Sequence, residues 1–192
     1  MIIIYPFSID APCKMHTRNL QLNDLYAVEM LGRSLFREAD EIPDLMKALR
    51  SYLSELSFVL VEDNKILGFT LVCKKMTNVY YSFMGSIPNC YELAFLGISS
   101  QCQGKGCGAQ LLIETLQAIS KQSKEFTCWL IVDVVNKPAQ RLYEKLGFRR
   151  WIQTDADITL IPGYIMGLSH RRYRTDTKHV IQTRPLPTIS VC

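Results

Sequence analysis

The sequence lacks most of the features that mark secreted, membrane-spanning and metal-stapled proteins. Its seven cysteines include no Cys-x-x-Cys pair and are odd in number, and no signal-like segment opens the chain, so we expect free thiols and no zinc site. No apolar run approaches the ~18 residues that a membrane helix needs. These absences predict a cytoplasmic or nuclear protein that binds neither a metal nor a membrane.

Excess charge is missing from most of the chain. Residues 171–192 contain five basic residues and one acidic residue and so carry the whole net charge of +4, while residues 1–170 contain 17 of each sign. A neutral body lacks the positive face with which proteins neutralise phosphates, so we expect no direct nucleic-acid binding. We expect residues 1–170 to form a single domain and residues 171–192 to form a basic tail that is loosely docked or disordered.

The sequence does contain a regular succession of strand and helix patterns. A strand pattern at residues 17–22 precedes two helical patterns, one with apolar residues from 25 to 35 and one from 42 to 56. Two further strands, at 58–62 and 66–72, flank a polar turn of hairpin length. The first part of the chain therefore predicts a strand, two helices and an antiparallel hairpin.

The second part alternates strands with helices. We expect strands at 90–98 and 126–133 joined by a helix at 106–120, then a helix at 137–146 and two last strands at 148–153 and 158–168. A strand–helix–strand unit implies a parallel pair joined by a right-handed crossover. The predicted fold class is α/β in the loose sense, or α+β, with a mixed sheet of about six to seven strands flanked by about four helices.

A glycine-rich turn stands between the expected strand at 90–98 and the helix that follows it. Its residues are Gln103, Gly104, Lys105, Gly106, Cys107 and Gly108. Glycines let a backbone approach a ligand closely, and the first-turn N–H groups of a helix have no internal partner, so this turn is suited to a pyrophosphate. A glycine turn also occurs simply as a tight corner. The spacing matches neither a Walker A loop nor a dinucleotide fingerprint, which excludes those two nucleotide sites.

A second motif lies on the helix expected at 137–146. At ~100° per residue, Asn136, Ala139 and Tyr143 share one helix face, which then presents an amide and a phenol. Gly147 is placed to end the helix, and Phe148 to pack back against it. The alternative is a helix-capping asparagine and a half-buried tyrosine with no chemical role.

Together, these two motifs resemble those of the GNAT superfamily of acetyl-CoA-dependent N-acetyltransferases. The turn resembles the family's Gln/Arg-x-x-Gly-x-Gly/Ala signature, and the later motif resembles its Asn…Ala…Tyr…Gly-Phe signature. The resemblance extends from about residue 17 to residue 168, with one helix and one strand between the motifs. It implies the GNAT fold, in which a splayed pair of parallel strands, here 90–98 and 126–133, holds the cosubstrate acetyl-CoA.

The resemblance also implies where acetyl-CoA would bind. Main-chain groups of Leu96, Gly97 and Ile98 would pair with the pantetheine arm, and the glycine-rich turn would take the pyrophosphate. Asn136 would touch the far arm of the cofactor or the leaving group. The expected cofactor-binding residues are therefore Leu96, Gly97, Ile98, Gln103, Gly104, Lys105, Gly106, Cys107, Gly108, Asn136 and Tyr143.

Acetylation of an amine needs a group that takes a proton and a group that gives one. A lysine-like amine with a pKa of ~10.4 is protonated at pH 7, and its deprotonation costs about 4.6 kcal/mol at roughly 1.36 kcal/mol per pKa unit. The thiolate leaves more easily if it receives a proton, and the Tyr143 hydroxyl offers one, so Tyr143 is the predicted general acid. Cys107 near a helix N-terminus offers an acetyl-cysteine route, but its place in the turn faces the pyrophosphate rather than the thioester.

Glu92 is the predicted general base. Strand alternation would place it on one face with Ala94, Leu96 and Ile98, an apolar neighbourhood that raises the pKa of a carboxyl group toward neutrality. The stretch is also similar to the Glu-x-x-Phe-x-x-Ile-Ser-Ser run of the histone-acetylating branch, in which a catalytic glutamate stands at this place. The alternative is a solvated glutamate at the edge of the sheet.

The acceptor side of the site is expected in loops. Glu38, Asp40 and Glu41, between the first two helices, are alternative bases and are placed to attract a cationic acceptor. Tyr164, in a Pro-Gly-Tyr bend before the last strand, is placed to gate the acceptor. These four are the candidate substrate-binding residues.

The sequence therefore predicts an enzyme, a monomer or homodimer, that transfers an acetyl group from acetyl-CoA to a primary amine by direct attack in a ternary complex. The Glu92 stretch favours a protein lysine as the acceptor. A protein N-terminus or a small amine of the polyamine type is the alternative. A hypothesis of another class is a non-catalytic CoA-binding scaffold, against which the presence of Tyr143 argues.

Overall fold

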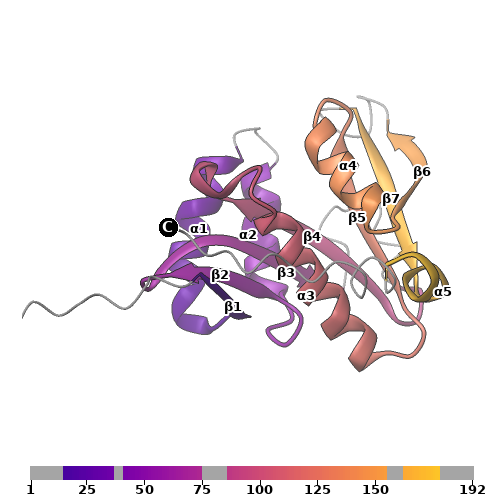
Figure 1. Cartoon of the computed structure of the whole chain (residues 1–192), viewed down its shortest axis with the longest axis horizontal. Helices are drawn as coiled ribbons and strands as arrows, with labels where there is room; N and C mark the ends of the chain where they lie inside the picture. The colour runs from indigo at the N-terminus through magenta and orange to yellow at the C-terminus, as the bar shows by residue number, and fades with distance from the viewer. Residues whose placement is uncertain (1–14, 37–40, 75–85, 155–161, 178–192) are drawn as a thin grey trace, which may run out of the picture.

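Seven strands form one mixed sheet in the computed structural model of the chain, which describes residues 15–36, 41–74, 86–154 and 162–177. The strand order is β1-β2-β3-β4-β5-β7-β6, and each neighbouring pair is antiparallel except β4 and β5 (Figure 1). The strands are β1 (His16–Asn19), β2 (Phe58–Glu62), β3 (Lys65–Cys73), β4 (Cys90–Ile98), β5 (Thr127–Asp133), β6 (Arg149–Thr154) and β7 (Gly163–Ser169). The predicted mixed sheet is confirmed.

The four helices expected from the sequence are present, although some of their ends differ from the expected ones, and a fifth, short helix was not expected. They are α1 (Leu25–Leu35), α2 (Glu41–Ser51), α3 (Cys107–Gln122), α4 (Lys137–Lys145) and the short α5 (His170–Arg172). The helical pattern of α2 was expected to continue to residue 56, but Tyr52 forms a β-bridge with Cys73, and the N–H of Leu53 donates to the carbonyl of Val72 at 2.8 Å. Pairing with β3 therefore ends α2 early. In the described ranges, no helix has both the length and the apolar character to cross a membrane.

Helices pack on both faces of the sheet. α1 and α2 cover one face, where Val28 and Leu45 join Phe69 in a buried cluster. α3 and α4 cover the opposite face, where Leu116 and Leu130 belong to a second cluster. Figure 1 shows α3 crossing the strands and α4 lying over β5 and β7. Both sequence motifs therefore lie on the α3–α4 side.

The parallel strands β4 and β5 pair only where they begin. The register joins residues 90–92 to residues 127–129, although β4 continues to Ile98 and β5 to Asp133. The two strands therefore separate over their second halves and open the middle of the sheet. This arrangement confirms the predicted splayed pair.

A β-bulge lies beside this opening. Leu71 of β3 pairs with Phe95, whereas its neighbour Val72 pairs with Leu93, so Ala94 is an additional residue on β4. An additional residue shifts the alternation of side chains on the strand that contains it. Side chains before and after Ala94 therefore do not follow one continuous alternation.

The first residues after β7 pack against the domain. Tyr173 is buried, and its ring centroid lies 5.6 Å from that of Phe126, the residue before β5. The first residues of the predicted tail therefore pack on the domain. Residues 178–192 lie outside the described part of the chain.

Candidate active site

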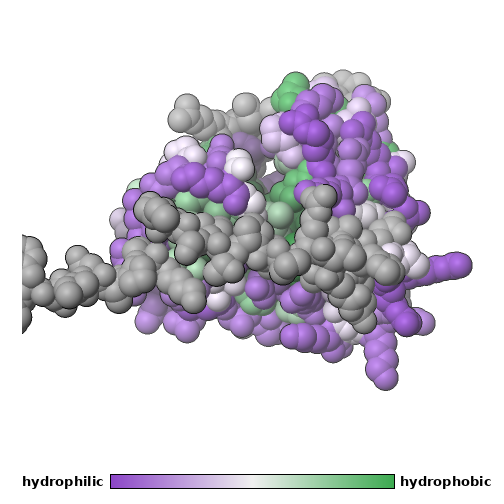
Figure 2. All heavy atoms as spheres, viewed as in Figure 1, coloured by the Kyte–Doolittle hydropathy of each residue, from purple (hydrophilic) through white to green (hydrophobic). Residues whose placement is uncertain are grey.

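A pocket of about 760 Å³ lies where β4 and β5 separate. The second halves of both strands, the turn that leads into α3, and one side of α4 line it. Figure 2 shows a hollow between α4 and this turn, with apolar side chains deep inside and hydrophilic side chains around the rim. The two sequence motifs thus form opposite walls of one pocket.

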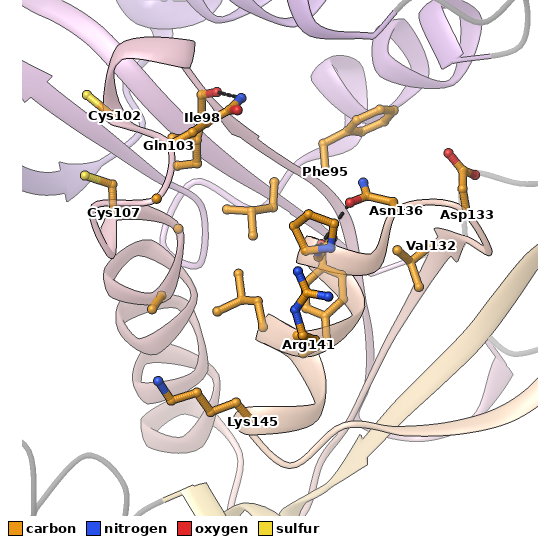
Figure 3. A pocket seen from close by; sticks show the side chains of 18 of the residues that line it. Phe95, Ile98, Cys102, Gln103, Cys107, Val132, Asp133, Asn136, Arg141 and Lys145 are labelled. Atoms are coloured by element: carbon orange, nitrogen blue, oxygen red, sulfur yellow. Dashed lines mark hydrogen bonds between the residues drawn. The ribbon is translucent and has the colours of Figure 1, made fainter.

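The turn before α3 forms the first wall and leaves its backbone open. Gly104 and Gly106 have φ angles of 74° and 86°, which favour glycine, and a Cβ at either position would find no atom within 4 Å. The Gln103 Nε2 donates to the carbonyl of Ile98 at 3.0 Å and ties the turn to the end of β4 (Figure 3). Gly106 is the N-cap residue of α3, and no side chain in the described part of the structure caps the helix. The first-turn amides are therefore available to an anion.

The structure brings most of the predicted cofactor-binding residues to this pocket. Those in its lining are Leu96, Ile98, Gln103, Gly104, Gly106, Cys107, Gly108, Asn136 and Tyr143. Gly97 is not in the lining, and a Cβ at this position would meet the Phe69 ring at 2.7 and 2.9 Å. Lys105 is exposed in the turn and is not in the lining either.

Both cysteines of this wall are packed thiols. Cys102 and Cys107 belong to a buried cluster with Leu60, Leu67 and Leu111. Burial raises the pKa of the Cys107 thiol, which disfavours the nucleophilic thiolate. Figure 3 shows both sulfur atoms turned away from the middle of the pocket. These observations oppose an acetyl-cysteine route.

Polar contacts hold α4, the opposite wall, against the end of β5. Asn136 accepts a hydrogen bond from the N–H of Ala139 at 3.1 Å, so it caps the helix while it also lines the pocket. The buried Gln140 donates to the carbonyls of Asp133 and Val134 at 2.6 and 3.0 Å. The sequence analysis missed this contribution of Gln140, because its partners are backbone groups that no side-chain pattern reveals.

Tyr143 lies on α4 at the buried side of the pocket. Its side chain is 8% exposed, and its ring centroid lies 5.8 Å from that of Phe148. Burial raises the pKa of its hydroxyl far above the ordinary tyrosine value, so the group keeps its proton at neutral pH. Within the described ranges, the hydroxyl has no hydrogen-bond partner, which leaves its proton available to a ligand.

Glu92 is buried beside the pocket rather than in its lining. It is 4% exposed and pairs with Cys73 of β3 and with Trp129 of β5, at the last position where β4 and β5 stay together. Burial, with a smaller contribution from the charge of Glu92, raises the pKa of the Cys73 thiol to about 12. The alternative of a solvated glutamate at the edge of the sheet is therefore wrong.

The bulge determines which side of the sheet Glu92 faces. Its pairing partner on β3 belongs to the cluster beneath α1 and α2, so Glu92 faces that side. Leu96 pairs with Thr70, whose hydroxyl lies 2.8 Å from that of Thr115 on α3, so Leu96 faces the opposite side. The prediction that Glu92 shares a face with Leu96 and Ile98 is wrong because the bulge breaks the alternation between them.

The end of the pocket toward α1 and α2 combines aromatic rings with carboxylates. Phe36 and Phe95 meet edge to face with ring centroids 5.0 Å apart, and both line the pocket. Glu41, in the first turn of α2, and Asp133, at the end of β5, line it as well. Of these residues the sequence analysis identified only Glu41, because the others come from three separate parts of the chain.

Of the remaining candidate acceptor residues, the structure describes only Tyr164, which is not in this lining. Tyr164 lies on β7, and the centroid of its ring is 4.6 Å from the Arg150 guanidinium. It packs against the buried cluster on the α3–α4 face of the sheet, outside the pocket lining. Glu38 and Asp40 lie outside the described residues.

Two cations of α4, Arg141 and Lys145, also line the pocket and were missed by the sequence analysis. Across the ranges that the structure describes, no group of three or more His, Cys, Asp or Glu residues could hold a metal ion. The charges of the pocket are thus carboxylates toward α2 and the end of β5, and cations along α4.

Comparisons with known proteins identify relatives of this chain. Residues 20–148 match the model of the acetyltransferase (GNAT) family. Mycothiol acetyltransferase from Acidothermus cellulolyticus is 32% identical over 121 residues, which cover 57% of this chain and 35% of that protein. The chain therefore spans about a third of the length of the curated relatives that it matches.

Solved structures share the fold at low sequence identity. The ribosomal-protein-S18-alanine N-acetyltransferase from Escherichia coli has a TM-score of 0.61 at 21% identity, over 81% of this chain and 93% of that chain. Naa50 from Arabidopsis thaliana, in complex with the bisubstrate analogue CoA-Ac-MVNAL, has a TM-score of 0.59 at 19% identity, over 81% of this chain and 98% of that chain.

Proposed function

Because the chain belongs to the acetyltransferase (GNAT) family, we propose that it transfers an acetyl group from acetyl-CoA to a primary amine by direct attack in a ternary complex. The observation that carries the proposal is one continuous pocket, which runs from the uncapped start of α3, past Tyr143, to the aromatic and acidic end near α2. An end suited to phosphates is thus joined to an end suited to an amine. The family resemblance drawn from the two sequence motifs is confirmed.

The residues of the first wall fit the diphosphate and arm of acetyl-CoA. The open space beside Gly104 and Gly106 leaves room for phosphate oxygens next to the first amides of α3. Beyond residue 92, the edge of β4 that faces β5 has no strand partner among the described residues, so Leu96, Gly97 and Ile98 offer main-chain groups there. A strand-like pantetheine arm with its own amides would satisfy that edge.

We propose that Tyr143 is the general acid. Its hydroxyl keeps its proton because it is buried, and it faces the pocket between the phosphate end and the amine end. It would donate this proton to the sulfur of the leaving thiolate as the carbon–sulfur bond breaks.

We propose that Glu92 is the general base and that it acts through a water molecule. Its side chain lies on the acceptor side of the sheet, at the point where β4 and β5 separate, but outside the pocket lining. One intervening water is a recognised route for such a transfer. Glu41 and Asp133, which do line the pocket, are the alternative bases.

We propose a protein lysine as the acceptor. The carboxylates of Glu41 and Asp133 would attract its ammonium group, and Phe36 and Phe95 would pack against its apolar stem. A protein N-terminus is one alternative, since one structural neighbour is a ribosomal-protein-S18-alanine N-acetyltransferase and another is in complex with the bisubstrate analogue CoA-Ac-MVNAL, and a polyamine is the other.

Acetyl transfer to a panel of amines tests these proposals directly. The panel contains a lysine peptide with a blocked N-terminus, a lysine-free peptide with a free N-terminus, and spermidine, each mixed with acetyl-CoA and the purified protein. We expect mass spectrometry to find the acetyl group on the lysine peptide. Transfer to another member would replace the acceptor, and binding of acetyl-CoA without transfer to any amine would favour the scaffold hypothesis.

A further inference from the structure

The segment that contains α5 lies at the end of the sheet opposite the pocket. The pocket opens toward the ends of β4 and β5, whereas Thr127, the first residue of β5, pairs with Ser169, the last residue of β7. α5 follows β7 directly, so it lies beside the beginning of β5. Figure 1 shows α5 on the side of the molecule away from the start of α3. A ligand bound at α5 would therefore leave the pocket accessible.

Two hydrogen bonds join this segment to the connection between α3 and β5. The N–H of His170 donates to the carbonyl of Phe126 at 2.7 Å, and the hydroxyl of Ser120 donates to that of Tyr173 at 3.5 Å. The ring centroids of Phe126 and His170 are also 5.3 Å apart. The two stretches of chain, which are distant in sequence, therefore lie side by side.

The two joined segments, residues 120–126 and 170–175, are rich in positive charge. Each of the hydrogen bonds between them has a cation one or two residues away on both segments. The five cations are Lys121, Lys124, Arg171, Arg172 and Arg174. Glu125, which is exposed, is the one carboxylate in the sequence of these segments. The surface around α5 therefore has an excess of positive charge, and Figure 2 shows hydrophilic side chains projecting from it.

Four of these cations are available to a ligand. They are exposed, and none of them has an ion-pair partner among the described residues. The four are Lys121, Lys124, Arg171 and Arg174. The rest of residues 1–170 carries no excess of positive charge, so the excess is local to this end of the molecule.

We propose that these four cations form a docking surface for an acidic segment of a partner protein. Guanidinium and ammonium groups bind carboxylates through charge-assisted hydrogen bonds, and complementary charge speeds the encounter of two proteins. A nucleic acid fits this surface less well, because a strongly salt-dependent nucleic-acid complex involves about 6–10 phosphate contacts. Since the surface lies opposite the pocket, the partner and acetyl-CoA can be bound at the same time.

Fluorescence anisotropy with labelled probes tests the proposal on the full chain. The probes are a peptide of about ten glutamates, a neutral peptide of the same length and a single-stranded oligonucleotide with the same number of charges. We expect the glutamate peptide to bind about tenfold more tightly than either of the other probes. Its affinity should fall as the salt concentration rises, because exposed charges are screened. Saturating acetyl-CoA should leave this affinity unchanged.

A matched pair of variants locates the bound peptide. Lys124→Gln/Arg171→Gln removes one exposed cation from each segment and should weaken binding of the glutamate peptide about fivefold or more. Lys65→Gln/Lys137→Gln removes two exposed cations at the starts of β3 and α4, and should leave the affinity unchanged. Both variants lower the net charge by the same amount, so a difference between them reports local contact.

Several outcomes would overturn the proposal. Failure of the wild type to bind the glutamate peptide would do so, and so would equal losses in the two variants, which would indicate attraction by net charge alone. Tighter binding of the oligonucleotide would make the partner a nucleic acid. Displacement of the peptide by acetyl-CoA would place the peptide in the pocket instead of at α5.

Discussion

Tyr143 brings together the two properties that a general acid needs, a retained proton and access to the pocket. In Tyr143→Phe the ring and its packing on Phe148 remain, but the proton donor is lost. We expect kcat to fall about 100-fold or more, with the Kd for acetyl-CoA nearly unchanged. Steady-state kinetics together with calorimetry would measure both values, and an unchanged kcat would remove Tyr143 from the mechanism.

The raised pKa of Tyr143 has a direct consequence for the pH dependence. A general acid stops working when pH rises above its own pKa, and burial places that point above the ordinary tyrosine value of ~10. Wild-type kcat should therefore show no decline attributable to a tyrosine as pH rises to ~10. A fall in kcat with a midpoint near pH 9, absent from Tyr143→Phe, would contradict this expectation.

Glu92 offers a second test at a single residue. Glu92→Gln keeps the shape of the side chain but cannot accept the proton, so kcat should fall near neutral pH and recover at high pH, where the amine loses its proton unaided. The rise of kcat with pH should therefore shift to higher pH. Glu41→Gln is the matched control, because it removes a carboxylate that lines the pocket itself. If only Glu41→Gln shifted the profile, Glu41 would be the base.

At the scale of elements, the sequence predicted most of the helices and strands but not the irregularity that orients Glu92. Hydrophobic periodicity identified β4, α3, β5 and α4, since each is long and bounded by glycine, proline or polar turns. The bulge at Ala94 depends on how β4 pairs with β3, which is a contact between distant parts of the chain. The early end of α2 has the same origin, because Tyr52 and Leu53 leave the helix to pair with β3.

The turn before α3 can be tested as an element through its glycines. Gly106→Ala should weaken acetyl-CoA binding about tenfold or more, because alanine is strained at a φ of 86° and its Cβ would enter the open space of the turn. Gly108→Ala is the matched control. Its Cβ would be only in ordinary contact with Leu142 and Ile98, at 3.4 and 3.5 Å. Calorimetry would measure both affinities, and equal losses would show that backbone freedom at Gly106 is not what binding needs.

At the scale of the whole molecule, the residues proposed to bind acetyl-CoA were more predictable than those proposed to bind the acceptor. Consecutive residues form the turn before α3, and one helix face carries Asn136 and Tyr143, so local spacing was sufficient to single out both groups of residues, which line the pocket. The acceptor end joins Phe36, Phe95 and Asp133 from different elements. No local pattern connects those residues, and only the folded sheet brings them together.

That assembly predicts how acetyl-CoA affects the stability of the whole molecule. The pocket is built from elements of both halves of the sheet, so it exists only in the folded chain, and a ligand that binds there must raise the free energy of unfolding. At 100 times its Kd, acetyl-CoA should add about 2.7 kcal/mol. For a chain of this size, each kcal/mol raises Tm by about 2–4 °C, so a thermal scan should show a rise of roughly 5–10 °C. Gly106→Ala at the same acetyl-CoA concentration should show a clearly smaller rise, and an equal rise would place the ligand away from the turn.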